Sequence, residues 1–107
     1  MEHPLCDRVA TVYRNTPEGV QRQVVEGCFY SYTDVFLPEG YLERRFFLVI
    51  PGRAALRPGD RVLEGEGPAT VDWNQFVPAA VKGLSQVDWV KQYTDHTQAG
   101  SGKTRWD

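Results

Sequence analysis

The chain has 107 residues, of which 41% are hydrophobic, 24% charged and 12% aromatic, and its formal net charge is -2. A chain of this length buries one small core, which excludes a multi-domain enzyme and leaves little room for a deep, enclosed active site. No apolar run approaches the roughly 20 residues of a membrane span, and the aromatic content argues against a disordered chain. We therefore expect one soluble domain over 1–107 whose function lies on a surface or a loop.

The charges and the N-terminus narrow the possible partners. The longest basic run is the pair Arg44-Arg45, so affinity for nucleic acid through phosphate neutralisation is not expected. Residues 1–6 lack the basic and apolar regions of a secretory signal, and we interpret them as the frayed end of an intracellular protein.

The two cysteines, Cys6 and Cys28, are expected to be reduced and half-buried, because no export signal precedes them. The sequence has no CxxC pair, and its two histidines, His3 and His96, are far from both cysteines along the chain. Neither a metal site nor a cofactor site is predicted.

The first part of the chain predicts two paired strands. Residues 8–14 form a β-branched stretch, and the polar cluster over 15–19 predicts a turn after it. Residues 21–32 predict a second strand of more than average length, and Gly27 in its middle predicts a bulge or bend.

The segment 33–43 combines Pro38 and Gly40 with several apolar side chains, which predicts an extended loop or arm. These apolar residues look like a surface that another chain covers. The predicted interface consists of Phe36, Leu37, Tyr41, Leu42 and Arg44. The alternative is a loop that folds back on its own domain.

The run 45–50 predicts a central strand that is buried on both faces. After it, Pro58-Gly59-Asp60 predicts a tight turn into a short strand. The segment 72–81 contains Pro78 and predicts a loop with at most a short helix.

The alternating pattern over 84–93 predicts a half-buried strand. The polar residues 94–102 predict a flexible hairpin loop, after which 103–106 pair back as a last short strand. The predicted fold is therefore all-β: a small antiparallel barrel or sandwich of about six strands, with one long loop and at most a short helix.

A search for catalytic groups finds no constellation that supports an enzyme. Gly102-Lys103-Thr104 resembles the end of a phosphate-binding loop, but Thr97 stands where that loop needs glycine, and too few residues follow to form the required helix. His96 lies in a polar loop without the support that a general base needs. We predict no catalytic residue, no cofactor and no small-molecule substrate.

An alternative hypothesis is a small bacterial β-barrel module that binds single-stranded nucleic acid or a peptide. Phe29, Tyr30 and Tyr32, with Arg44 and Arg45 nearby, could form a base-stacking platform. The same aromatic residues are also expected in the core of a small barrel, and the surrounding charge is not basic.

Several short motifs follow one another in a set order: Val12-Tyr13, Gly27-Cys28-Phe29-Tyr30, Val49-Ile50-Pro51, the stretch from Arg57-Pro58-Gly59-Asp60 to Glu66, Val87-Asp88 and Arg105-Trp106. In this order, the chain resembles small minor capsid or head-tail joining proteins of tailed phages and of prophages in Gram-positive bacteria. The resemblance covers most of the chain, roughly 8–106.

The resemblance implies a non-enzymatic subunit of the head-tail connector, either a head-closure or an adaptor component. Its expected partners are further copies in a homo-oligomeric ring, together with portal or adaptor proteins and tail proteins. DNA is expected to pass through the lumen without sequence-specific binding. The implied location is the virion, after assembly in the cytoplasm of the bacterial host, with no contact to a membrane.

Overall fold

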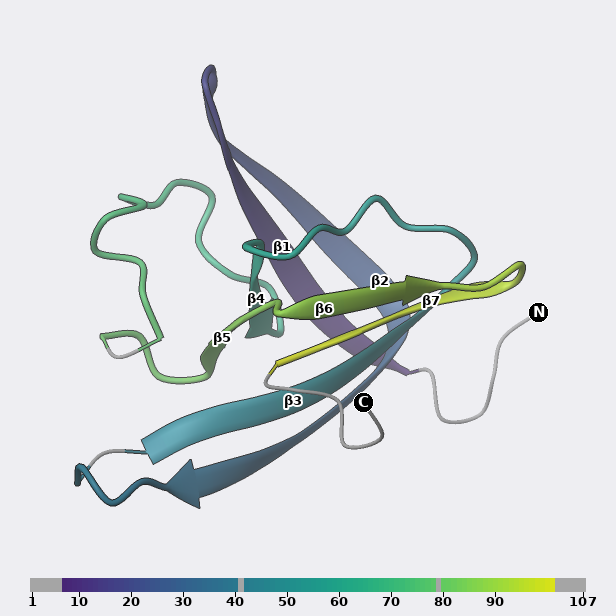
Figure 1. The fold of residues 1–107 in the computed structure, drawn as a ribbon. Helices are drawn as coiled ribbons and strands as arrows, with labels where there is room; N and C mark the ends of the chain where they lie inside the picture. Colours follow the sequence, from purple (N-terminus) through teal and green to yellow (C-terminus); the bar gives the residue numbers. More distant parts are fainter. Residues whose placement is uncertain (1–6, 41, 79, 102–107) are drawn as a thin grey trace.

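The structure, a computed structural model, describes residues 7–40, 42–78 and 80–101. This part of the chain is all-β, as predicted, and contains no helix. Its strands pair antiparallel throughout and form one curled sheet of seven strands, in the order β5-β4-β1-β2-β3-β7-β6 (Figure 1). The strands are β1 (Arg8–Thr16), β2 (Gly19–Phe36), β3 (Leu42–Pro51), β4 (Arg61–Glu64), β5 (Leu84–Gln86), β6 (Trp89–Gln92) and β7 (His96–Gly100).

The two edge strands of the sheet, β5 and β6, are consecutive in the chain and are joined by Val87 and Asp88. Val87 exchanges backbone hydrogen bonds with the turn before β4, to Asp60 O and from Gly59 N, both at 2.8 Å. Asp88 N donates to Gly100 O of β7, also at 2.8 Å. The chain thus passes from one edge of the sheet to the other, which gives the sheet its half-barrel shape.

β2 links the two halves of the sheet, because its first part pairs with β1 and its second part pairs with β3. At the transition, Arg8 is opposite Cys28 whereas Val9 is opposite Glu26, so Gly27 is the extra residue of a bulge. Its φ of 69° is a conformation that favours glycine. The structure therefore confirms the bulge predicted at Gly27.

The main core lies on the concave face of the sheet and consists of Ala10, Val12, Cys28, Tyr30, Phe46, Leu48, Ile50, Leu56, Val62, Val87 and Ala99. A smaller cluster of Tyr13, Phe76 and Leu84 lies under the loop between β4 and β5. Arg61 of β4 holds that loop in place: its Nη1 donates to Trp73 O at 2.7 Å and Phe76 O at 2.6 Å, and its guanidinium stacks on the Trp73 ring. Both clusters bury apolar area that stabilises the fold.

The prediction that 45–50 is buried on both faces is wrong for one face. Phe46, Leu48 and Ile50 are buried in the core, but Phe47 and Val49 on the opposite face are only half-buried. The reason is that β3 lies in a single curled sheet, so its convex face has no second sheet over it in the described part of the chain.

Two further predictions for the second half of the chain need correction. The strand predicted over 84–93 is divided into β5 and β6, because the chain changes pairing partners from β4 to β7. Most of the loop predicted over 94–102 is strand β7, since its backbone pairs with both β3 and β6. The sheet has seven strands, in agreement with the predicted fold of about six.

The loop predicted over 72–81 is a loop without a helix in its described residues. Asp72 closes one turn there, since its O accepts from Phe76 N at 2.8 Å and its Oδ1 accepts from Asn74 N at 3.1 Å. The predictions for 1–6 and for a last strand over 103–106 fall outside the described residues. Among those that are described, no helix is long and apolar enough to span a membrane.

Candidate functional site

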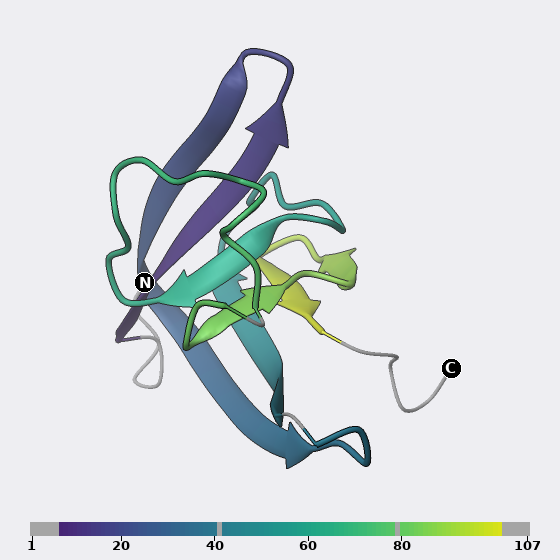
Figure 2. The same cartoon turned by 90° about the vertical axis from the view of Figure 1, so that its left-hand side faces the viewer.

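The candidate site is the distal part of the β2–β3 hairpin, residues 33–45, which we call the arm. Its strands pair in register from Thr33↔Arg45 to Phe36↔Leu42, whereas β7 pairs with β3 only from Phe47 onward. The arm is therefore a two-stranded ribbon that extends beyond the body of the sheet, on the side opposite the β1–β2 hairpin (Figures 1 and 2). The extended loop predicted over 33–43 is mostly strand, because both segments continue the antiparallel ladder of β2 and β3.

The arm is fastened at its base by stacked polar side chains. Arg44 donates from Nε to Asp34 Oδ1 at 3.0 Å, and its guanidinium lies 3.6 Å from the ring centroid of Tyr32. The hydrogen bond from Arg44 lowers the pKa of Asp34, and the same bond raises the pKa of Arg44. Cross-strand pairing and a cation–π contact thus define the direction in which the ribbon leaves the body.

The tip of the arm displays Phe36, whose residue is 70% exposed, the largest value among the large hydrophobic residues in the described part of the chain. Gly40 N donates to Leu37 O at 2.9 Å and closes the turn. Gly40 has a φ of 98°, which favours glycine.

The five predicted interface residues differ in position and exposure. Phe36 is exposed at the tip, Leu37 is half-buried in the turn, and Arg44 is at the base, where it is paired with Asp34. Tyr41 and the side chain of Leu42 lie outside the described residues.

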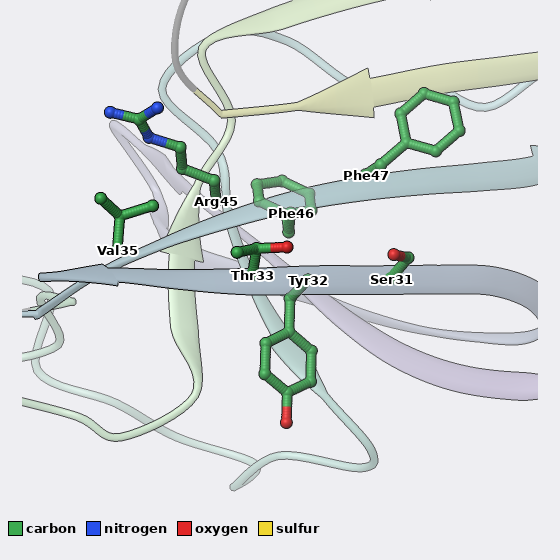
Figure 3. A pocket seen from close by; sticks show the side chains of 7 residues that line it. All are labelled: Ser31, Tyr32, Thr33, Val35, Arg45, Phe46 and Phe47. Atoms are coloured by element: carbon green, nitrogen blue, oxygen red, sulfur yellow. The ribbon is translucent and has the colours of Figure 1, made fainter.

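A second surface feature is a row of aromatic rings on the convex face. Phe29 and Phe47 have ring centroids 6.3 Å apart, and Phe47 and Trp89 are 6.0 Å apart. The row continues toward the arm as a shallow depression of about 360 Å³ that also involves Val35 and Arg45. Figure 3 shows these two side chains and Phe47 on one side of the ribbon, with Tyr32 pointing to the other side.

The predicted base-stacking platform of Phe29, Tyr30 and Tyr32 does not lie on one face. Tyr30 is 5% exposed and stacks in the core on Phe46 at 5.9 Å, whereas Phe29 belongs to the convex face. Burial raises the pKa of the Tyr30 hydroxyl, while the neighbouring Ser85 and Arg44 act in the opposite direction. Tyr30 is therefore a core residue, as expected if these aromatic residues pack in a small barrel.

His96, Gly100 and Cys28, the described candidates for catalysis, are all held by packing or hydrogen bonds within the sheet. His96 stacks on Tyr93 with 4.6 Å between ring centroids, and its Nδ1 is 2.7 Å from Asp95 Oδ1. Gly100, two residues before the Gly102-Lys103-Thr104 stretch that resembles the end of a phosphate-binding loop, belongs to β7 and lies under the Trp89 ring. Cys28 is fully buried rather than half-buried, because it faces the core, and its Sγ donates to Arg8 O at 3.3 Å.

The remaining functional predictions fall outside the described residues or find no support in them. Cys6, His3, Lys103 and Thr104 are not described. Within 7–40, 42–78 and 80–101, no group of three or more His, Cys, Asp or Glu side chains is arranged to hold a metal ion.

Two arginine contacts with structural importance were not predicted from the sequence. Asp60 is 3% exposed and accepts from Arg14 Nε at 3.0 Å and from Arg14 Nη2 at 2.8 Å. Arg61 holds the loop over the smaller core cluster, and burial lowers the pKa of Arg61. The only sequence signal for either contact is the turn Pro58-Gly59-Asp60, because it places Asp60 and Arg61 at the start of β4.

None of the family models, curated proteins or solved structures with which the chain was compared matches it.

Proposed function

We propose that the chain is a non-enzymatic structural subunit of a phage or prophage head-tail connector: a minor capsid, head-closure or adaptor protein that forms a ring between portal and tail. In this proposal, the protein assembles in the bacterial cytoplasm, becomes part of the virion and surrounds a lumen through which DNA passes. The order of short motifs along the sequence supports the proposal.

The observation that carries the proposal is the exposure of Phe36 at the end of a regular ribbon. The ribbon continues two strands of the core, so its direction is set by the sheet and by the contact between Arg44 and Tyr32. At the end of this ribbon, Phe36 stays 70% exposed to solvent among the described residues. A neighbouring subunit or a portal-side protein would cover it.

The test is the production of infectious particles in cells whose own copy of the gene is deleted and replaced by a variant. Phe36→Ser should abolish particle assembly, while Pro17→Ser, at the exposed turn of the other hairpin, should leave assembly unchanged. Both variants should unfold within about 0.5 kcal/mol of the original protein, because they change exposed positions. Normal particle numbers with Phe36→Ser would contradict the proposal.

A second candidate function is the binding of single-stranded nucleic acid or a peptide on the convex face. The half-buried row of Phe29, Phe47 and Trp89 favours it, because neighbouring aromatic rings on one face can form a stacking surface. Binding of an oligonucleotide that weakens steeply with salt would support it. No binding at low ionic strength would exclude the nucleic-acid version.

A further inference from the structure

The exposed aromatic residues of this protein are at two separate places. Among the described residues, three large hydrophobic residues are exposed: Tyr32 directly before the arm, Phe36 at its tip, and Tyr93 beside the turn between β6 and β7. Figure 1 shows the tip of the arm and the β6–β7 turn on opposite sides of the molecule. Phe36 and Tyr93 therefore cannot contact each other within one chain.

The β6–β7 turn presents a flat aromatic surface. The rings of Tyr93 and His96 stack with an interplanar angle of 11°, and Tyr93 N donates to His96 O at 2.8 Å. His96 is held from two sides, by Asp95 Oδ1 at 2.7 Å and by Gln98 Nε2 at 3.2 Å. We call the stacked pair of Tyr93 and His96 the platform. Its fixed geometry suits a second aromatic ring, which can stack on it or meet it edge to face.

The two places also carry exposed charges that could pair between copies; at the β6–β7 turn, the exposed Asp95 carboxylate is already bound by His96 Nδ1. Glu39 is exposed in the turn of the arm, close to Phe36 in sequence. Arg53 is exposed and follows Gly52, whose N donates to Asp95 O at 2.7 Å, so Arg53 lies beside the platform. The arm thus offers an aromatic ring with a negative charge, and the platform offers aromatic rings with a positive charge.

We propose that the arm of one copy of this chain docks on the platform of the next copy, with Phe36 against Tyr93 and His96 and with Glu39 near Arg53. The inference rests on the proposed function, which makes a second copy the partner. Because the two surfaces differ and lie on opposite sides, the contact is heterologous, and its repetition produces a closed ring or an open chain rather than a two-fold dimer. One hairpin tip is a small contact, so we expect weak association that becomes strong through repetition around a ring.

The first test joins the two surfaces by a disulfide between copies. In a Cys6→Ser background, the double variant Glu39→Cys with Arg53→Cys should form a ladder of cross-linked multimers under mild oxidation. The control pairs Arg53→Cys with Glu18→Cys, an exposed glutamate at the turn of the other hairpin. The double variant should cross-link at least about tenfold faster than the control, because docking raises the local thiol concentration. Equal rates would overturn the inference.

A mixture of single variants tests the direction of the contact. Glu39→Cys mixed with Arg53→Cys should give dimers that contain one copy of each variant and no longer species, since every copy then has only one reactive surface. Dimers formed mainly between copies of the same variant would contradict the heterologous contact.

A charge exchange tests the pairing of Glu39 with Arg53 without cysteines. Glu39→Arg and Arg53→Glu should each reduce self-association, measured by sedimentation, and the protein that carries both changes should recover it. If both single changes leave sedimentation unchanged, the two charges do not meet.

The two proposals fail in different ways. If Phe36→Ser abolishes infectious particles but the cysteine pair does not cross-link, the arm binds another connector protein and the contact between copies is wrong. If the cysteine pair cross-links but Phe36→Ser leaves particle numbers normal, copies associate through the arm and the connector function is wrong.

Discussion

The two hairpins that share β2 end in different ways. At the β1–β2 turn, Thr16 Oγ1 donates to Gly19 O at 2.7 Å and accepts from Glu18 N at 3.2 Å, so polar side chains complete the turn. At the turn of the arm, Phe36 is 70% exposed. A hairpin that ends in self-contained polar contacts needs no partner, whereas one that keeps an exposed aromatic ring is suited to binding.

The bases of the two hairpins differ as well. The β1–β2 hairpin is attached to the body by the buried contact of Arg14 with Asp60, and by Arg22, whose Nη2 donates to Gly67 O at 2.6 Å. The pair of Arg44 with Asp34 at the base of the arm joins its two strands to each other instead, and the Asp34 side chain is 38% exposed. The β1–β2 hairpin therefore contributes to the stability of the fold, whereas substitutions in the arm should have little effect on stability.

The largest effect on the free energy of unfolding is expected at the base of the β1–β2 hairpin. Asp60→Ala removes the acceptor of both Arg14 contacts and of Arg57 N, which donates to Asp60 Oδ2 at 3.0 Å. We expect the free energy of unfolding to fall by about 3 kcal/mol, because a buried pair loses one partner. Urea denaturation measures this, with Asp34→Ala as the matched control on the arm. If Asp60→Ala lowers the free energy of unfolding less than Asp34→Ala does, the conclusion that the β1–β2 hairpin contributes more to stability than the arm is wrong.

The second-largest effect on the free energy of unfolding is expected where β2 passes from one hairpin to the other. Gly27 has a φ of 69°, so Gly27→Ala should lower the free energy of unfolding by about 1–2 kcal/mol through backbone strain. Gly27→Asn should cost less than the alanine change, because asparagine adopts this conformation more readily. If alanine proves as stable as glycine in urea denaturation, the bulge does not require glycine.

The sequence allowed prediction of the features that depend on local residue types. The bulge at Gly27 follows from a glycine inside a β-branched run, and the turn before β4 follows from Pro58-Gly59-Asp60. The all-β class follows from the absence of helical periodicity. These features could be predicted because each is determined within a few residues.

The features that were missed depend on pairing between distant residues. The polar composition of 96–100 indicated a loop, but β3 on one side and β6 on the other supply hydrogen-bond partners that make it a strand. For 33–43, the sequence predicted an extended loop or arm but not the cross-strand pairing that makes its ends a ribbon. For the candidate site, the sequence predicted the segment and Phe36, but the platform of Tyr93 and His96 depends on the geometry of a turn.

A smaller effect is expected at Tyr30, where the core meets the base of the arm. The Tyr30 hydroxyl is buried beside Ser85 and Arg44, and burial raises its pKa above the ordinary value of 10.0 more than these two neighbours lower it. Above that pH the unfolded chain loses this proton before the folded protein does, so stability falls as pH rises. Tyr30→Phe should make the fall in urea midpoint from about pH 9 to about pH 11 shallower than in the original protein. An unchanged slope would mean that Tyr30 ionises equally in both states.

The smallest effect on stability is expected at Asp34, in the exposed pair at the base of the arm. Hydrogen bonding to Arg44 lowers the pKa of Asp34 below 3.8, so its contribution is present above that pH and disappears as the pH falls through the lowered value. Asp34→Asn should leave the urea midpoint at neutral pH nearly unchanged, because exposed pairs contribute little. It also removes one of the two contacts that direct the arm, so cross-linking between cysteines at Glu39 and Arg53 should slow although the protein remains folded. If cross-linking keeps its rate, the stack of Arg44 on Tyr32 is enough to hold the arm in place.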